Sequence, residues 1–233
     1  SGDYLASALA STKLAGRQWA LPQQAAAAGW MCNSDLLRKA GTTVAGNWAD
    51  VAKQAPTLQA LGVTPMAITS VGTEAFPFVY SAGGAMLDLT NRTVTINDKP
   101  AVAGFTTAID LENSGAATKV GTSDEAVHAF TAGQVACILA GPSVMPTVLA
   151  APAFANPSAL SITPVPDGTD QGSSSFGGAN IAVSAASHQT DAALQLVGYL
   201  NSTASQTQLA ATWAGFPARN SSLREARSAV PSA

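Results

Sequence analysis

Short apolar runs alternate along this chain with stretches whose apolar residues recur at helical spacing. Over residues 100–114, Val102, Phe105 and Ile109 mark one face of a helix. Further helices are predicted over residues 3–11, 34–39, 74–81, 190–201 and 203–213. The apolar runs predict strands over residues 17–21, 29–32, 66–69, 134–140, 160–165 and 181–183. Strands that alternate with helices in this way predict an α/β fold.

Capping residues and helix or strand breakers set several of these boundaries. Asn33 or Ser34 caps the helix that follows, and Gly41 supplies the left-handed residue that ends it. Asn47 is a favourable cap for a second helix. Pro22 is expected to stop the strand that precedes it, because proline lacks the N–H that a strand ladder uses.

Composition narrows the classes of protein that this chain represents. Its 233 residues are 47% hydrophobic and 11% charged, and this length allows one large domain or two small ones. The net charge is −3 and the sequence has no basic stripe, so nucleic acid is not expected as a partner. The chain has no run of 18 or more apolar residues, and its first residues lack the features of a signal peptide.

The two cysteines and two histidines give little support to catalysis or metal binding. Cys32 and Cys137 either form a single bridge or remain free as buried core residues. His128 and His188 have no second histidine at metal-ligand spacing, so no metal or cofactor is expected. Nothing in the sequence supports a Cys32–His128 nucleophile pair, and no catalytic motif occurs, so we expect a protein that is not an enzyme.

A series of short motifs, spread over most of the chain, gives the strongest indication of function. The series is Leu21-Pro22, Asn33–Gly41, Trp48, Pro77-Phe78, Gly83-Gly84, Phe130 with Gly133, Gly141-Pro142, Gly177-Gly178 and Phe216-Pro217-Ala218-Arg219. In this order and with these gaps, it resembles the extracellular solute-binding proteins of ABC importers, in the branch that includes maltose-binding protein. The resemblance implies a two-lobe α/β fold of the periplasmic-binding-protein type (type II).

The resemblance also implies how the chain is divided into lobes. Crossovers are expected near residues 22–28 and 164–172. The first lobe would contain residues 1–28 and 169–202, and the second lobe residues 29–165 and 203–233. Relatives carry a long segment before the Leu-Pro crossover. We therefore expect the second lobe to be nearly complete and the first to be partial, with a missing N-terminal segment of the same protein as its partner.

By the same resemblance, the protein is expected to capture a carbohydrate or related polar solute in a cleft between the lobes, by hinge closure. It would deliver this solute to the transmembrane subunits of an ABC permease. Such a protein is exported to the periplasm or cell surface, and an N-terminal Cys outside this chain could carry a lipid anchor. Two alternatives stay open: a glycerophosphodiester as the ligand, and a sensory or interaction module that keeps the fold without transport.

Residue chemistry and the resemblance together indicate the candidate ligand contacts. Glu74 would accept hydrogen bonds, Phe76 would stack on a sugar face, and Arg219 would make a forked contact to a polar ligand. Ser143 stands where relatives often have a stacking Trp. The full set is Gln24, Glu74, Phe76, Ser143, Gly177, Gly178, Asn180, Trp213, Phe216 and Arg219.

Several of these residues have a plain structural alternative. Phe76 and Trp213 are equally suited to core packing, Arg219 to a surface ion pair and Asn180 to a buried turn. Glycines allow close backbone approach, so the Gly177-Gly178 pair would let a ligand reach the main chain.

Overall fold

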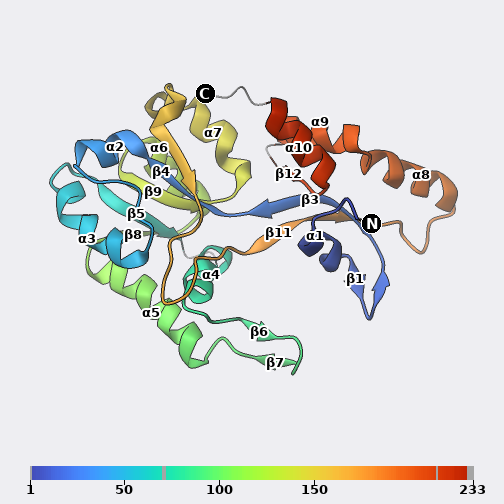
Figure 1. Ribbon diagram of the computed structural model, residues 1–233, viewed down its shortest axis with the longest axis horizontal. Helices are drawn as coiled ribbons and strands as arrows, with labels where there is room; N and C mark the ends of the chain where they lie inside the picture. Colours follow the sequence, from blue (N-terminus) through green and yellow to red (C-terminus); the bar gives the residue numbers. More distant parts are fainter. Residues whose placement is uncertain (1, 70–71, 214, 230–233) are drawn as a thin grey trace. The chain divides into compact units, whose positions relative to one another are not determined.

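The computed structural model of the chain describes residues 2–69, 72–213 and 215–229. The chain divides into two compact units (Figure 1). Unit 1 comprises Ser1–Ala27 and Phe176–Ala233, and unit 2 comprises Ala28–Ser175. Unit 2 is therefore a continuous stretch of sequence, whereas unit 1 is assembled from segments on either side of it.

The described residues of unit 2 form a mixed five-stranded sheet with the strand order β10-β4-β9-β5-β8. Its strands are β4 (Gly29–Asn33), β5 (Thr64–Thr69), β8 (Ala117–Val120), β9 (Val135–Ala140) and β10 (Leu160–Thr163). β5 runs parallel to β8 and β9, and β4 pairs antiparallel with β9 and β10. The carboxyl ends of β5, β8 and β9 consequently lie along one edge of the sheet.

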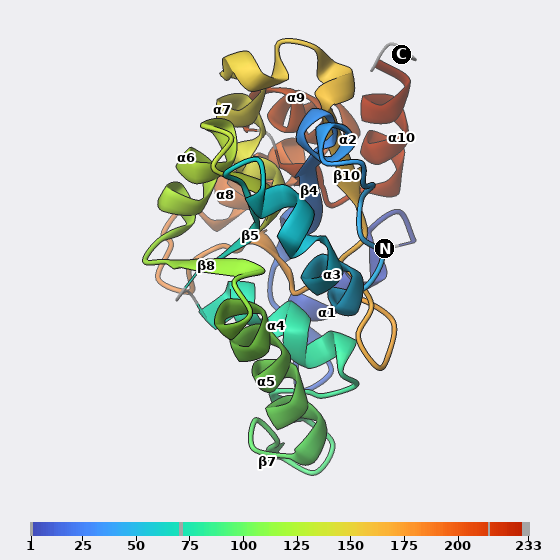
Figure 2. The ribbon, with the colours of Figure 1, turned by 90° about the vertical axis from the view of Figure 1, so that its left-hand side faces the viewer.

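Both faces of this sheet are buried. Trp30, Cys32 and Met66 belong to one hydrophobic core, while the alternating residues Met31 and Ala67 belong to another. Successive side chains of a strand point to opposite faces, so each face has its own core. The first face is covered by α2 (Ser34–Lys39), α3 (Trp48–Gln59), α4 (Gly72–Ser81) and α5 (Lys99–Asn113), and the second by α6 (Ser123–Thr131) and α7 (Met145–Ala150) (Figure 2).

Short elements connect these helices and strands. They are the hairpin of β6 (Leu87–Asp88) and β7 (Thr93–Val94), and the 3-10 helices η1 (Pro142–Val144), η2 (Pro152–Phe154) and η3 (Pro157–Ala159). The cap of α2 is Asn33, whose side chain accepts hydrogen bonds from the backbone N–H groups of Asp35 and Leu36. A strand at β8 was not among the predicted elements.

The two cysteines form a disulfide within unit 2. Cys32 of β4 lies directly opposite Cys137 of β9 in the antiparallel register, and both side chains are buried. Of the two alternatives that the sequence left open, the structure has the bridge. It joins strands whose cysteines are 105 residues apart in sequence.

Unit 1 contains a three-stranded sheet with the order β11-β3-β12 among its described residues. Its strands are β3 (Leu21–Ala27), β11 (Phe176–Ile181) and β12 (Phe216–Pro217), and its helices are α1 (Ala6–Ser11), α8 (Thr190–Leu200), α9 (Thr203–Trp213) and α10 (Asn220–Ala229). A small hairpin of β1 (Lys13–Leu14) and β2 (Arg17–Gln18) precedes β3. Both pairings of β3 are antiparallel.

Two strand predictions in unit 1 were wrong. The predicted strand at 17–21 does not stop at Pro22, because β3 begins at Leu21 and continues through it. Pro22 lies opposite Asn180, next to an irregularity in the register, and a proline is tolerated at such a bulge. The partner strand β11 covers the two glycines and ends at Ile181, where we expected a strand to begin.

Residues 203–233 were predicted to belong with residues 29–165, and this assignment is corrected. They are part of unit 1, because β12 pairs with β3 and because the backbone N–H of Leu5 donates to the carbonyl of Ala218 at 2.9 Å. The predicted assignment rested on the resemblance alone, and no local pattern in the sequence indicates the pairing.

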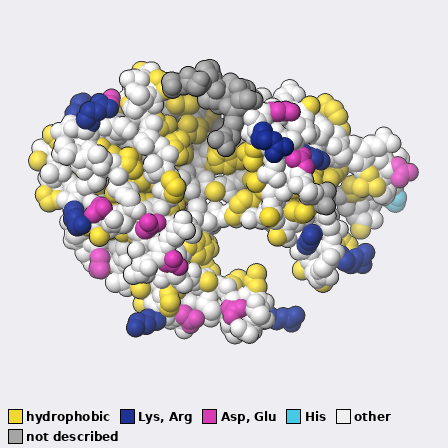
Figure 3. Space-filling model, viewed as in Figure 1, with side chains coloured by type: hydrophobic (Ala, Val, Ile, Leu, Met, Phe, Trp, Pro, Cys, Tyr) yellow, Lys and Arg dark blue, Asp and Glu magenta, His cyan; other side chains and the backbone are white. Residues whose placement is uncertain are grey.

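The surface carries dispersed charges. On the face shown in Figure 3, the Lys and Arg side chains of the described residues are scattered singly or in small groups, with acidic side chains between them. Within the described ranges, the helices are all too short or too polar to cross a membrane.

Removal of the disulfide is expected to destabilise unit 2. In the Cys32→Ser, Cys137→Ser double variant, the unfolded chain is no longer closed into a long loop. This should cost about 4 kcal/mol of unfolding free energy, or on the order of 10 °C in Tm. Thermal unfolding followed by circular dichroism measures the loss. Reduced wild-type protein is the control and should behave like the variant. Equal Tm values for oxidised wild type and variant would show that the bridge contributes no stability.

Candidate functional site

Polar residues gather in unit 2 where three parallel strands end. Glu74 follows β5 in the first turn of α4, Ser123 follows β8, and Ser143 follows β9 in η1. The carboxyl ends of the strands in an open α/β sheet are the usual place for a ligand, because the loops there converge. Glu74, Ser123 and Ser143 line one pocket of about 120 Å³.

Glu74 is held in place by two hydroxyl groups. The Thr69 Oγ1 hydroxyl at the end of β5 donates to Glu74 Oε2 at 2.5 Å, and the Ser123 hydroxyl donates to Oε1. An ionised carboxylate has about four acceptor positions, so it can accept further hydrogen bonds from a ligand. The structure thus brings the predicted residues Glu74 and Ser143 together, and adds Ser123, which was not among the predicted ligand contacts. The side-chain cap of α6 is Thr122.

Phe76, the predicted stacking residue, does not line this pocket. It lies on α4 half-buried, with its ring centroid 6.2 Å from that of Tyr80. Its contact with a ligand stays a prediction.

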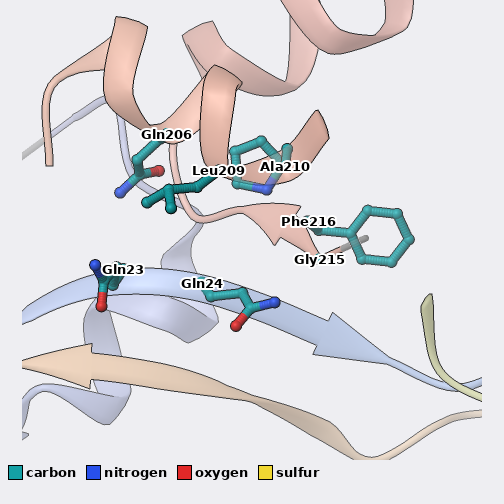
Figure 4. Close-up of a pocket in the computed structure, with 8 residues that line it drawn as sticks. Gln23, Gln24, Gln206, Leu209, Ala210, Gly215 and Phe216 are labelled. Atoms are coloured by element: carbon teal, nitrogen blue, oxygen red, sulfur yellow. The ribbon is translucent and has the colours of Figure 1, made fainter. Parts of the chain in front are cut away.

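A second polar corner lies in unit 1 (Figure 4). It is lined by Gln23 and Gln24 of β3, by Gln206, Leu209 and Ala210 of α9, and by Gly215, Phe216 and Pro217. Gln206 and Leu209 project from α9 toward β3, and the ring of Phe216 extends away from that helix. The enclosed space of about 10 Å³ holds roughly one water molecule, so the corner is an amide and aromatic surface rather than a cavity for a whole solute.

Gln24 and Phe216 are the predicted residues that this corner brings together. Phe216 is 45% exposed, as a stacking ring must be. Gln24 packs tightly against Gly215: a Cβ atom at that glycine would lie 1.7 Å from the Gln24 amide nitrogen. A side chain at position 215 would therefore displace the amide of Gln24, a constraint that sequence reasoning missed.

The predicted glycine pair lies in β11, where its members have different surroundings. Gly178 has φ +143°, and a Cβ atom there would lie 2.0 Å from the carbonyl oxygen of Gln24. The close backbone approach at Gly178 is thus to β3 and not to a ligand. A Cβ atom at Gly177 would meet nothing within 4 Å.

Asn180 lines neither the pocket in unit 2 nor the corner in unit 1. The Asn180 side-chain amide donates to the hydroxyl of Ser11 at 3.1 Å and so ties β11 to α1. This contact favours a structural role for Asn180. α9 ends at Trp213, whose side chain lies outside the described part of the structure.

Arg219 is engaged in contacts within unit 1. Its Nη1 donates to Asp3 Oδ2 at 3.0 Å, and its Nε donates to the backbone carbonyl of Asn201 at 2.5 Å. The guanidinium also lies 4.5 Å from the ring centroid of Tyr4. These contacts favour the ion-pair alternative for Arg219, in which it holds the N-terminal segment, and its contact with a ligand stays a prediction.

The partner of this arginine is an unusually acidic carboxyl. The pKa of Asp3 is lowered from 3.8 to about 2. The largest cause is the hydrogen bond from the Ser221 hydroxyl at 2.6 Å, and the hydrogen bond from Arg219 lowers the pKa further. Asp3 therefore joins Arg219 and Ser221 as an ionised group at neutral pH.

Polar side chains at the strand ends of an α/β sheet are a common setting for binding a small polar molecule. The model of the family of bacterial extracellular solute-binding proteins matches residues 1–207. The chain therefore belongs to this family, whose members are solute-binding proteins rather than enzymes. No curated protein sequence matches the chain.

Solved structures agree with this family. The GacH receptor of Streptomyces glaucescens, determined unliganded and with acarbose, is 31% identical over 99% of this chain, with a TM-score of 0.89. Maltose-bound MalE3 of T. maritima is 22% identical over 97% of the chain (TM-score 0.83). UgpB of Mycobacterium tuberculosis, in complex with glycerophosphocholine, is 20% identical over 99% of the chain (TM-score 0.83). The predicted two-lobe periplasmic-binding-protein fold is confirmed, and the chain spans 60–62% of the length of these proteins.

The two glycines of β11 provide a matched pair of substitutions. Gly178→Ala should destabilise unit 1 by about 2 kcal/mol or more, because the new methyl group meets the backbone of β3 and the backbone conformation is strained. Gly177→Ala, which meets open space, is the control and should change stability by less than about 1 kcal/mol. Chemical denaturation compares the two. Similar losses for both variants would contradict the close approach.

The Asp3 contacts predict a pH dependence of stability. Since the folded pKa of about 2 lies below the ordinary 3.8, the contribution is fully present above about pH 4 and is lost as pH falls through about 2. Wild type should therefore exceed Asp3→Asn in stability at about pH 5, and the difference should shrink toward pH 2. Urea denaturation at several pH values measures it. Ser221→Ala should retain part of the effect, and a difference independent of pH would contradict the assignment.

Proposed function

We propose that this chain is the ligand-capturing part of an extracytoplasmic substrate-binding subunit of an ABC importer, and that its solute is a carbohydrate. The observation that carries the proposal is the polar pocket at the ends of β5, β8 and β9, where the Glu74 carboxylate is oriented by two hydroxyls. Sugar hydroxyls donate to such an acceptor. In unit 1, the amide of Gln24 and the exposed ring of Phe216 suit the hydroxyls and the apolar face of a sugar.

The charges favour a carbohydrate over a glycerophosphodiester. Among the described residues that line the pocket in unit 2 and the corner in unit 1, Glu74 is the charged one, and its carboxylate carries negative charge. A phosphate about 4 Å from this carboxylate would be repelled by roughly 4 kcal/mol at the effective dielectric of a protein surface. Arg219, the predicted ligand contact that carries a positive charge, is paired with Asp3. UgpB shares the fold with this chain, and at 20% identity the likeness supports the fold alone.

The GacH receptor, which is 31% identical to this chain, was determined with acarbose, and this supports a carbohydrate as well. In the proposed mechanism the solute bridges two lobes and shifts the population toward a closed form that the permease subunits recognise. The hinges would lie in the crossovers near residues 22–28 and 164–172. A sensory or interaction module on the same fold would bind the same solute without the permease.

The mechanism includes no covalent step. Cys32 is bonded to Cys137, so the Cys32–His128 pair has no thiol to act as a nucleophile. The protein would be exported and would act at the periplasmic or cell-surface side of the membrane, with a lipid anchor as the proposed means of attachment.

Calorimetric titration of the intact protein tests the proposal. Maltose and acarbose should bind saturably, and glycerophosphocholine should not. Glu74→Gln should weaken carbohydrate binding about tenfold to a hundredfold, because it removes the charge from the acceptor of the ligand hydroxyls. Glu112→Gln, on the exposed face of α5, is the matched control and should bind like wild type. Saturable binding of glycerophosphocholine without carbohydrate binding, or an unchanged affinity in Glu74→Gln, would overturn it.

A further inference from the structure

One polar side chain in unit 1 is almost completely buried beside the corner that holds Gln24 and Phe216. Gln206 of α9 is 1% exposed. An amide in such surroundings is costly unless its hydrogen bonds are made. The hydrogen bonds of Gln206 therefore show which parts of unit 1 depend on this side chain.

Gln206 makes hydrogen bonds to three separate parts of unit 1. Its Nε2 donates to the backbone carbonyl of Pro22 in β3 at 3.1 Å and to Oδ1 of Asn201 at 3.1 Å. Its Oε1 accepts from the backbone N–H of Arg219 at 3.0 Å. Both N–H groups of the amide are thus used. Asn201, which follows α8, is itself fully buried and donates to the carbonyl of Val197.

The two backbone partners flank the residues of the candidate site. Pro22 is followed in β3 by Gln23 and Gln24, and Arg219 lies three residues after Phe216. The sheet pairing between these segments is short, since β12 contains two residues. One side chain therefore joins the start of the strand that carries Gln24 to the end of the strand that carries Phe216.

We propose that Gln206 is a positioning residue that fixes Gln24 and Phe216 relative to each other, and that solute affinity depends on it. This inference rests on the proposed function for the role of the corner. The joining of β3 to β12 itself is independent of any ligand. Gln206 need not touch the solute, because it acts through the two strands.

A carboxylate of the same size at this position would replace the two N–H donors of Gln206 by an acceptor. At neutral pH, Gln206→Glu would place a charged acceptor against the carbonyl of Pro22 and the Oδ1 of Asn201, with no donor between them. Burial and these acceptors raise the pKa of such a group, so acid would protonate it and restore one donor. The charged groups nearby are Asp3 and Arg219 in their ion pair and Glu225 of α10, which accepts from Thr207. Asp3, with a pKa of about 2, stays ionised over this range.

The test compares Gln206→Glu in the intact protein with Gln208→Glu, the same substitution on the exposed face of α9. Titrations with maltose and acarbose are made at about pH 8 and pH 5. We expect at least about tenfold weaker binding of Gln206→Glu at the higher pH, recovering to within about threefold of wild type at the lower pH. Gln208→Glu should bind like wild type at both. A Gln206→Glu variant that binds like wild type at the higher pH overturns the proposal.

Two further measurements test the role of Gln206: sugar binding by a second variant, Gln206→Met, and hydrogen exchange without ligand. Gln206→Met keeps the volume and removes all three hydrogen bonds, so its binding should be weak at both pH values; wild-type affinity in this variant overturns the proposal even if Gln206→Glu fails to fold. Hydrogen exchange should show lost protection at residues 22–25 and 216–219, with residues 135–140 of unit 2 unchanged. If wild type binds neither sugar, the proposed function fails. Unchanged exchange in both variants overturns the role of Gln206.

Discussion

Antiparallel pairing of β3 with both β11 and β12 is the interaction on which unit 1 depends. The strand lies between two partners that come from the other side of unit 2 in the sequence. Other contacts of unit 1 preserve this pairing. Gly178 allows β11 to approach the backbone at Gln24, and Gln206 forms hydrogen bonds to Pro22 in β3 and to Arg219 just after β12. Arg219 in turn ties the N-terminal segment to this end of β12. The residues proposed to contact the solute are carried by the same strands, so their placement follows from the pairing.

In unit 2, polar groups are confined to the ends of the strands. The sheet is buried on both faces, so its strands have little surface left on which polar side chains can lie. Glu74, Ser123 and Ser143 are held there by helix starts that follow rigid strands. A carboxylate fixed by two hydroxyls loses little conformational freedom when a ligand arrives, which is an advantage for binding.

Much of unit 2 and part of the site could be predicted from the sequence, and the reasons for the failures are physical. Caps and apolar spacing identified α2 and α9, whereas Glu74 and Ser143 were proposed through the resemblance to solute-binding proteins. β8 was missed because it is a short edge strand containing Lys119. β3 and β11 were misread because alanines and glycines carry little strand preference, and their structure comes from pairing with each other. The pairing of Arg219 with Asp3 could not be predicted because the two residues are 216 apart in sequence, where no local pattern can show it.

The division of the chain into a continuous unit and an interrupted one sets an order of folding. Residues of unit 2 follow one another without interruption, so this unit can close its sheet, and join Cys32 to Cys137, as soon as its own stretch has left the ribosome or the export channel. β3 emerges earlier, yet it has to wait for β12, which arrives about 190 residues later. Before β11 is made, the alanine-rich β3 has open edges on both sides, and until β12 follows, one of its edges stays open. An open edge is where a strand is most exposed to mispairing with another chain. The sheet that β3 begins is thus completed by β12, the last of its three strands in the sequence.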